Sequence, residues 1–285
     1  MNQSINKVAV LGAGVMGAQI AGHFANAGIP GLLYDINQEL AQKGVDGLTK
    51  MKPAPLYKPK NADLVEACNY DEHLKKLNEV DLVIEAVAER LDIKHAVYNN
   101  IVPHLKESVI MTSNTSGIPL SDLISVLPDH LKKRFMITHF FNPPRYMRLL
   151  ELIKGPDTDE AVYEMIAEFG EDVLGKGIVH AKDTPNFIGN RIGVLGMSVT
   201  MNTAIKNGLT VEEVDKLTGT VIGRPKSATF RTADVVGLDT MINVSNTSYK
   251  NLPDDEEREE FKIPIFLQKL VDDGNLGAKT KAGFY

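Results

Sequence analysis

A histidine and a glutamate, each set alone in an apolar run, are suited to proton chemistry. His139 lies in run 135–141, whose aromatic and β-branched residues are typical of a buried strand. Glu151 is the one carboxylate in run 149–153. The prolines after the first run cannot continue a central strand, so the chain turns there. A hairpin centred on Arg145 places His139 opposite Glu151.

This pair has two interpretations. A buried carboxylate needs a partner, because an unpaired charge is too costly in an apolar environment. A histidine held by a carboxylate is oriented and more basic, so it can act as a general base. In the other interpretation, His139 is a core histidine beside a glutamate at the solvent edge.

The first 35 residues follow the order strand, glycine turn, helix, strand and acid, which is typical of a dinucleotide-binding unit. The predicted strands are 7–11 and 31–34, and Asp35 ends the second. Asp35 can accept hydrogen bonds from both ribose hydroxyls of an adenosine. It would repel a 2′-phosphate, and no arginine follows at once. The sequence therefore favours NAD over NADP as the cofactor.

Three glycines of the turn have separate tasks in this interpretation. Gly12 permits a tight turn, Gly14 lets the backbone approach the pyrophosphate, and Gly17 lets the helix and the strand pack closely. The helix that begins there offers free N–H groups and a partial positive charge to the phosphates. The alternative is a glycine turn with a purely structural task.

Polar residues follow the next two predicted strands. Glu89 comes after strand 81–87, and Ser116 comes after strand 108–112. In an open α/β sheet, ligands sit beyond the carboxyl ends of the strands, so both residues are candidates for the site. Residues at strand ends also act as simple caps, which is the other interpretation.

Segment 37–80 has a weaker pattern. A helix is predicted over 37–51, and prolines break it. A local cluster of lysines follows in an otherwise acidic protein, namely Lys50, Lys52, Lys58 and Lys60. One interpretation is a solvated loop, and the other is a contact to the phosphates of an extended substrate.

The alternation of strands and helices stops near residue 183, after a predicted helix over 159–173 and a strand over 177–181. The later part is all-helical, with predicted helices over 186–207, from the capping box at 210–213, over 233–251 and over 255–273. We therefore expect an α/β domain of Rossmann type, residues 1–183, with a mostly parallel sheet and helices on both faces. An all-α C-terminal domain, residues 184–285, follows it.

The composition limits the class of protein. The chain has 285 residues, of which 43% are hydrophobic and 24% charged, as in ordinary globular proteins. A net charge of −6 gives no electrostatic footprint for nucleic acid or acidic membranes. The single cysteine, Cys68, excludes an internal disulfide and fits a reducing compartment. Without a signal peptide, a membrane-spanning run or a metal-ligand cluster, we expect a soluble cytoplasmic protein.

Taken together, the motifs resemble the NAD-dependent L-3-hydroxyacyl-CoA dehydrogenases of fatty-acid β-oxidation, nearly end to end. The resemblance rests on 12–17 (GAGVMG), 113–116 (SNTS), 139–143 (HFFNP), 182–191 (KDTPNFIGNR), 236–239 (VGLD) and 277–285 (GAKTKAGFY). Segments 142–146 (NPPRY) and 222–230 (IGRPKSATF) look most like bacterial long-chain members. In those proteins this unit is fused ahead of further helical and enoyl-CoA hydratase segments.

The resemblance implies roles for the residues at the reacting centre. His139 would be the catalytic base and Glu151 its partner. Ser116 and Asn190 would bind the 3-oxygen of the substrate, and Asn190 lies near the domain boundary, where pockets are common.

The resemblance also implies contacts to the cofactor. Glu89, Lys94 and Ser116 match cofactor-contacting positions beside Asp35. Asn142 would help to place the substrate thioester or the nicotinamide. Family members usually carry a longer helical segment for CoA before the strand at Asp81, so no CoA contact is assigned.

The implied reaction is oxidation of an (S)-3-hydroxyacyl-CoA to a 3-ketoacyl-CoA with NAD⁺. One alternative is an NAD-binding fragment or non-catalytic relative that needs further C-terminal segments for activity. Another is a dehydrogenase of a smaller 3-hydroxy acid. The implied partners are the acyl-CoA substrate, a second copy in a homodimer, and a fused or associated enoyl-CoA hydratase.

Overall fold

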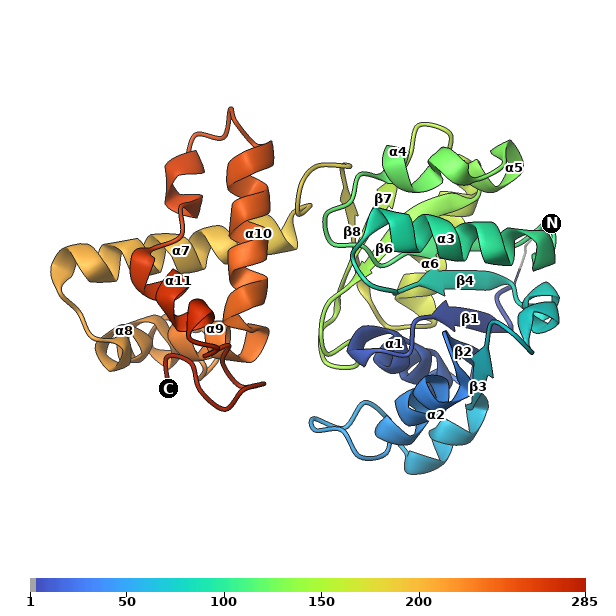
Figure 1. Ribbon diagram of the computed structural model, residues 1–285, viewed down its shortest axis with the longest axis horizontal. Helices are drawn as coiled ribbons and strands as arrows, with labels where there is room; N and C mark the ends of the chain where they lie inside the picture. Colours follow the sequence, from blue (N-terminus) through green and yellow to red (C-terminus); the bar gives the residue numbers. More distant parts are fainter. Residues whose placement is uncertain (1–3) are drawn as a thin grey trace. The chain divides into compact units, whose positions relative to one another are not determined.

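The computed structural model of the protein describes residues 4–285. These residues divide between Asp183 and Thr184 into two compact units (Figure 1). The first unit is built on a sheet whose strands alternate with helices, and the second unit is helical. Within residues 4–285, no helix has both the length and the apolar character needed to cross a membrane.

The first unit contains a sheet with the strand order β3-β2-β1-β4-β5-β6-β7-β8. Neighbouring strands pair in parallel, except for β6 and β7, which form an antiparallel hairpin. This is the mostly parallel Rossmann-type sheet that the sequence predicts. The strands are β1 Val8–Leu11, β2 Gly31–Asp35, β3 Val65–Asn69, β4 Leu82–Glu85, β5 Ile110–Ser113, β6 Phe135–Phe140, β7 Leu149–Lys154 and β8 Gly177–Ala181.

Helices connect these strands. The α-helices are α1 Val15–Asn26, α2 Gln38–Gly47, α3 Leu91–Ile101, α4 Leu120–Leu123, α5 Asp129–Lys132 and α6 Glu160–Asp172. Short 3-10 turns cover Pro59–Leu64, Leu74–Glu79, Val102–His104 and Ile124–Val126.

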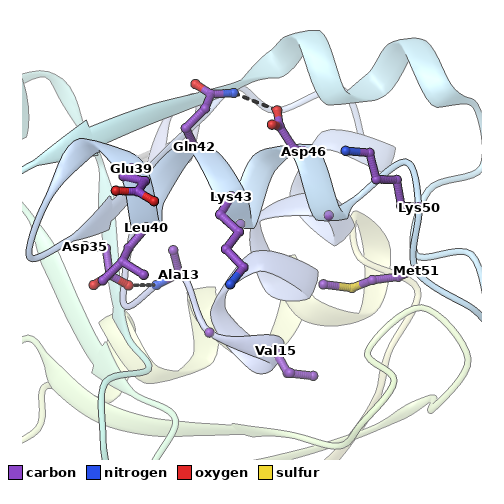
Figure 2. Close-up of a pocket in the computed structure, with 13 residues that line it drawn as sticks. Ala13, Val15, Asp35, Glu39, Leu40, Gln42, Lys43, Asp46, Lys50 and Met51 are labelled. Atoms are coloured by element: carbon purple, nitrogen blue, oxygen red, sulfur yellow. Dashed lines mark hydrogen bonds between the residues drawn. The ribbon is translucent and has the colours of Figure 1, made fainter.

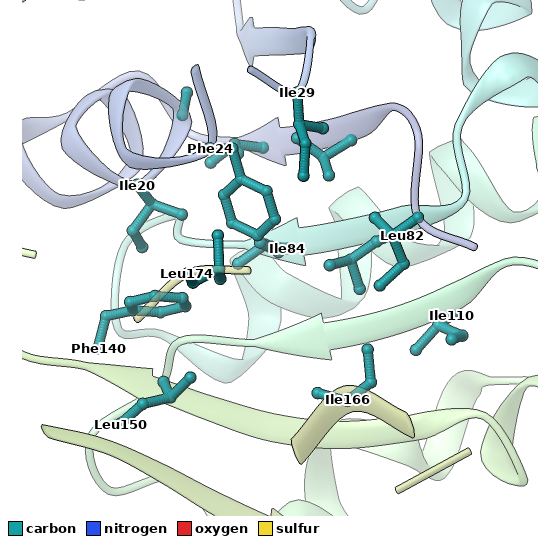
Figure 3. Close-up of a cluster of buried hydrophobic side chains, with 14 of the residues drawn as sticks. Ile20, Phe24, Ile29, Leu82, Ile84, Ile110, Phe140, Leu150, Ile166 and Leu174 are labelled. Atoms are coloured by element: carbon teal, nitrogen blue, oxygen red, sulfur yellow. The ribbon is translucent and has the colours of Figure 1, made fainter. Parts of the chain in front are cut away.

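The two faces of the sheet have different characters. Successive strand residues point to opposite faces. Met136 and Leu150 pack in the main apolar cluster, together with Phe24 of α1 and Ile166 of α6 (Figure 3). Phe135, the neighbour of Met136, instead lies 6.1 Å from Tyr98 of α3 between ring centroids. Helices therefore cover both faces, and His139 and Glu151 alternate onto the α3 face.

The second unit consists of α7 Gly189–Asn207, α8 Val211–Thr218, α9 Phe230–Val236, α10 Leu238–Asn251 and α11 Ile265–Asp272, with 3-10 turns at Thr220–Ile222 and Arg258–Phe261. Its core gathers buried side chains from all five helices, including Met201, Val214, Phe230, Leu238 and Leu267. The predicted capping box of Thr210 at the start of α8 is confirmed.

Two predictions in the helical part are wrong. Segment 233–251 is not one helix, because the chain breaks at Gly237, whose φ of 100° lies outside the helical region. Segment 255–273 is not continuous either, since α11 begins only after Pro264. The helix expected over 186–207 begins later, at Gly189, because Asn186 and Phe187 have positive φ angles.

The edge strand β3 does not stand out in the sequence. Its residues Val65–Asn69 include Glu66 and Asn69, which are uncommon in strands. β3 forms by parallel pairing with β2, from Gly31 opposite Val65 to Asp35 opposite Asn69. Pairing with β2 thus makes this segment a strand, although its own residues do not predict one.

Candidate active site

The turn between β1 and α1 contains two glycines that the packing of the protein itself requires. Gly12 has a φ of 98°, and a Cβ atom there would lie 2.6 Å from the carbonyl oxygen of Ala86. A Cβ atom on Gly17 would lie 1.8 Å from the carbonyl oxygen of Gly12. Any side chain at either position would therefore displace the backbone.

Gly14 is different, because no atom of the protein lies within 4 Å of a Cβ built there. Its φ of −65° is also open to any residue. The absence of a side chain leaves an exposed cradle at the N-terminus of α1, where backbone N–H groups attract a pyrophosphate. The turn therefore fits a dinucleotide on the protein's own geometry.

Asp35 ends β2 beside this turn. Its Oδ2 accepts a hydrogen bond from the Ala13 N–H at 2.7 Å, and its Oδ1 accepts one from the Ile36 N–H at 2.7 Å. Each carboxylate oxygen keeps a further lone pair that ribose hydroxyls can use. The carboxylate is thus fixed against the glycine turn and still able to bind.

A hollow of about 840 Å³ adjoins Asp35 and Gly14, between the turn and α2 (Figure 2). Its volume lies within the range of small-molecule sites. The exposed amines of Lys43 and Lys50 are on its wall, and Met51 closes one end. Three carboxylates line it as well, so the hollow has the size of a nucleotide site and carries charges of both signs.

The β6–β7 register pairs His139 with Glu151, so the predicted hairpin is confirmed. His139 Nδ1 lies 2.8 Å from Glu151 Oε2, and both side chains are buried. The carboxylate accepts a hydrogen bond, so it fixes the proton on Nδ1 and leaves Nε2 as the acceptor. Nε2 lies 3.2 Å from Ser116 Oγ. Three residues of the predicted site therefore meet at one point.

Glu89 holds the loop that carries Ser116. Its Oε1 accepts hydrogen bonds from the Ser116 N–H at 2.8 Å and from the Thr115 hydroxyl at 2.5 Å. Burial raises the pKa of Glu89, but the Lys94 ammonium and these donors outweigh burial and lower it overall. Glu89 is therefore a carboxylate with half of its side chain open to solvent.

Lys94 lies behind Glu89, on α3, and is 1% exposed. Its Nζ is 3.2 Å from Glu89 Oε2 and 2.7 Å from Glu85 Oε1. The resemblance implies a cofactor contact for Lys94, and this stays a prediction. In the structure its buried ammonium contacts Glu85 and Glu89 and so helps to hold Glu89 in place.

Glu85 is a buried residue of this site that the sequence analysis missed. Its Oε1 accepts from the Lys94 amine and, at 2.8 Å, from the Val87 N–H. Its Oε2 accepts from the Ser113 hydroxyl at 2.6 Å and the Tyr98 hydroxyl at 3.0 Å. The available signal was a lone carboxylate in the apolar run 82–87, the same signal that marked the hairpin glutamate.

Asn142 is exposed just beyond β6. Gln19 of α1, which is buried, donates from Nε2 to Asn142 Oδ1 at 3.0 Å. This contact directs the amide oxygen of Asn142 toward α1 and leaves its NH₂ group as the donor for a ligand. Gln19 also escaped the sequence analysis, since nothing in its local pattern separates it from other helix residues.

Asn190 lies in the first turn of α7, in the second unit, and is half-buried. Its approach to His139 stays a prediction. Among residues 4–285, no group of three or more histidine, cysteine or acidic side chains is arranged to hold a metal ion.

The fold and these contacts define a class of protein: a dinucleotide-binding α/β protein with a carboxylate-held histidine at the carboxyl end of a central strand. Comparison with known proteins agrees. The family model for the 3-hydroxyacyl-CoA dehydrogenase NAD-binding domain matches residues 7–184, and that for the C-terminal domain matches residues 187–285. The chain belongs to the 3-hydroxyacyl-CoA dehydrogenase family, and its cofactor is NAD.

Individual relatives cover the whole chain. A Bacillus subtilis protein named "Probable 3-hydroxyacyl-CoA dehydrogenase" is 44% identical over 100% of this chain, which spans 39% of that protein. A Deinococcus radiodurans protein of the same name is 45% identical over 99% of this chain, which spans 82% of it. The crystal structure of FadB2 from M. tuberculosis has a TM-score of 0.87 at 28% identity, with 99% of both chains covered.

Proposed function

We propose that the protein oxidises (S)-3-hydroxyacyl-CoA to 3-ketoacyl-CoA with NAD⁺, as a step of fatty-acid β-oxidation. The observation that carries this proposal is the placement of His139, with Nδ1 on buried Glu151 and Nε2 3.2 Å from the Ser116 hydroxyl. Membership of the family supports the acyl-CoA substrate class.

The chain's own residues transfer the proton and hold the substrate in position. NAD⁺, when bound, would supply the acceptor for the hydride from C3 of the substrate. His139 takes the hydroxyl proton at Nε2, and the Glu151 carboxylate stabilises the imidazolium that forms. Ser116 and Asn190 bind the 3-oxygen. In the reverse direction, the imidazolium returns the proton to that oxygen.

The cofactor would be held along the carboxyl edge of the sheet. Gly14 leaves room for the pyrophosphate, and Asp35 takes the adenosine ribose. Glu89, Ser116 and Asn142 would serve the nicotinamide half, because they lie at the ends of β4, β5 and β6 respectively. All of these residues belong to the first unit.

We also propose a cytoplasmic location, which the buried, unpaired thiol of Cys68 supports. The proposed partners are a second copy of the chain and an enoyl-CoA hydratase, fused or associated. The chain spans 39% of the Bacillus relative, so longer arrangements of this unit exist among similar proteins.

The test is NADH oxidation, followed by absorbance, with acetoacetyl-CoA as substrate and free acetoacetate as the control. Turnover of the thioester alone is the expected result. Turnover of the free acid would instead favour a dehydrogenase of a smaller 3-hydroxy acid. No turnover, with NADH binding intact by fluorescence, would contradict the proposal and leave a cofactor-binding unit that needs further segments for activity.

A further inference from the structure

The chain between α2 and β3 contains a mostly exposed segment, residues 51–60, which we call the arm; only its Pro55 and Leu56 are buried. It carries Lys52, Lys58 and Lys60, all exposed. No ion pair among residues 4–285 involves these lysines. In a protein of net charge −6, three unpaired cations on one segment offer a surface for an anionic group.

No helix or strand covers residues 51–58, so the position of the arm depends on side-chain contacts, among them that of buried Leu56 with the main apolar cluster. The most extensive contact comes from the loop between β6 and β7. Arg145 Nη1 donates to the carbonyl oxygens of Ala54 at 2.7 Å and Leu56 at 2.9 Å. Its guanidinium also lies 4.4 Å from the ring centroid of Tyr57. Arg145 therefore contacts three residues of the arm, and the Tyr146 hydroxyl adds a hydrogen bond to the Ala54 carbonyl oxygen at 3.2 Å.

The loop that carries Arg145 is itself held firmly. Lys176, which is 5% exposed, donates to the carbonyl oxygen of Pro144 and, at 3.0 Å, to that of Met147. The loop also follows directly from the β6–β7 pairing around His139. The loop is therefore the rigid side of the contact, and the arm is the side that Arg145 positions.

A second anchor ties the arm to the C-terminal end of α1. Asn26, the last residue of α1, donates to the carbonyl oxygen of Pro55 at 2.9 Å and accepts from the Tyr57 N–H at 2.8 Å. The arm is thus fixed between the helix that begins at the glycine turn and the hairpin that carries His139.

We propose that Arg145 is a positioning residue for substrate recognition, which holds the lysine-bearing arm at a fixed distance from His139. An anionic end of the thioester substrate that binds the arm would then place its reactive carbon at the histidine. This inference rests on the proposed function. It adds the residue that sets the spacing between the site for the anionic end of the substrate and the reacting centre. Small misplacements of a substrate lower rates steeply, so the spacing has kinetic consequences.

The test compares two thioesters in wild-type protein and in Arg145→Ala. Acetoacetyl-CoA carries the phosphates, whereas S-acetoacetylpantetheine carries the same reacting group without them. We expect Arg145→Ala to lower kcat/KM about 10-fold or more for acetoacetyl-CoA, through KM, and to leave kcat/KM for the pantetheine thioester unchanged. Arg145→Lys keeps the charge but cannot span two carbonyls and a ring, so it should behave like Arg145→Ala.

The matched control is Arg148→Ala, because this exposed arginine of the same hairpin makes no side-chain hydrogen bond or ring contact with the arm. It should leave both substrates unaffected. Hydrogen exchange of peptides over 52–61 should speed up about 10-fold or more in Arg145→Ala and not in Arg148→Ala. NADH affinity should stay the same in all variants.

The outcomes separate the two proposals. Turnover of neither thioester by the wild type would overturn the proposed function itself. Wild-type turnover with an equal loss on both thioesters in Arg145→Ala would overturn the positioning role and leave a general structural one. Unchanged exchange of the arm in Arg145→Ala would also overturn it, because the arm would then be held without the arginine.

Discussion

Gly14 and Gly17 lie three residues apart in one turn, and the structure gives their missing side chains different reasons. A Cβ atom on Gly17 would collide with the Gly12 carbonyl, whereas one on Gly14 would meet nothing within 4 Å. Because the Gly17 collision is internal to the protein, a side chain at this position should lower the stability of the fold. Gly14 instead faces open space at a helix N-terminus, so a side chain there should lower the affinity for a ligand.

The corresponding prediction uses the two alanine variants. Gly14→Ala should keep the unfolding midpoint of the wild type and weaken NADH binding about 10-fold or more, because its methyl group occupies the pyrophosphate cradle. Gly17→Ala should lower the midpoint, since the backbone of the turn must move. Thermal unfolding and NADH fluorescence titration measure both effects. Equal stability losses in the two variants would contradict the assignment.

His139 gives the second prediction at this scale. His139→Ala should lower kcat about 10²–10⁴-fold with NADH affinity nearly unchanged, because the proton acceptor is lost and the glycine turn is not. Glu151→Gln should lower kcat as well, since an amide cannot stabilise the imidazolium as a carboxylate does. Steady-state kinetics with acetoacetyl-CoA measures both. Activity that survives His139→Ala would show that the base lies elsewhere.

At the scale of elements, β4, α3 and β5 form one polar unit on the α3 face of the sheet. Buried Glu85 of β4 binds Lys94 and Tyr98 of α3 and Ser113 of β5. Lys94 in turn reaches Glu89, which accepts from the Ser116 backbone. The position of Ser116 beside His139 therefore depends on a buried carboxylate three contacts away.

This arrangement predicts that Lys94→Met is strongly destabilising, by about 3–5 kcal/mol, because buried Glu85 loses its counter-ion. Combining it with Glu85→Gln should recover part of the loss. The exposed Arg90–Asp92 pair on the same helix supplies the control, since Arg90→Ala should change stability little. Urea unfolding of the variants measures these differences. A double variant less stable than Lys94→Met would contradict the coupling of the two residues.

The elements also show what sequence could reveal and what it could not. The hairpin that joins His139 to Glu151 was predictable, because its two runs and the prolines between them are local signals. The Glu85–Lys94 contact was not, since it needs the packing of α3 on the sheet. β3 was missed for a related reason: its ordering comes from pairing with β2. The break at Gly237 shows that helical periodicity can hide a single residue with a non-helical φ.

On the scale of the whole molecule, the predicted cofactor residues all fall in the first unit, and Asn190 falls in the second. The polar cluster of the first unit contains more carboxylates than ammonium groups, and its histidine accepts a proton in the proposed reaction. Buried ionisable groups elsewhere in the first unit also make the stability of the fold depend on pH. His23 is the clearest of these groups.

His23 of α1 is 5% exposed, and its Nε2 lies 3.1 Å from the Leu174 carbonyl oxygen. Burial, and then the nearby Lys176 ammonium, lower the pKa of His23 to about 4, while the Leu174 contact acts in the opposite direction. The unfolded chain has the ordinary value near 6.5 and binds the proton first as pH falls. His23 therefore costs no stability above about pH 6.5, and its cost grows as pH falls toward 4.

At pH 5 this cost should be about 2 kcal/mol, from the difference between the two pKa values. His23→Gln cannot take up a proton, so its stability relative to wild type should improve by that amount between pH 7.5 and pH 5. Exposed His130 supplies the control, because His130→Gln should show no such change. Urea unfolding followed by circular dichroism at both pH values measures the difference. A wild-type protein that tracks His23→Gln over this range would mean that the acid sensitivity of the fold comes from its carboxylates and not from this histidine.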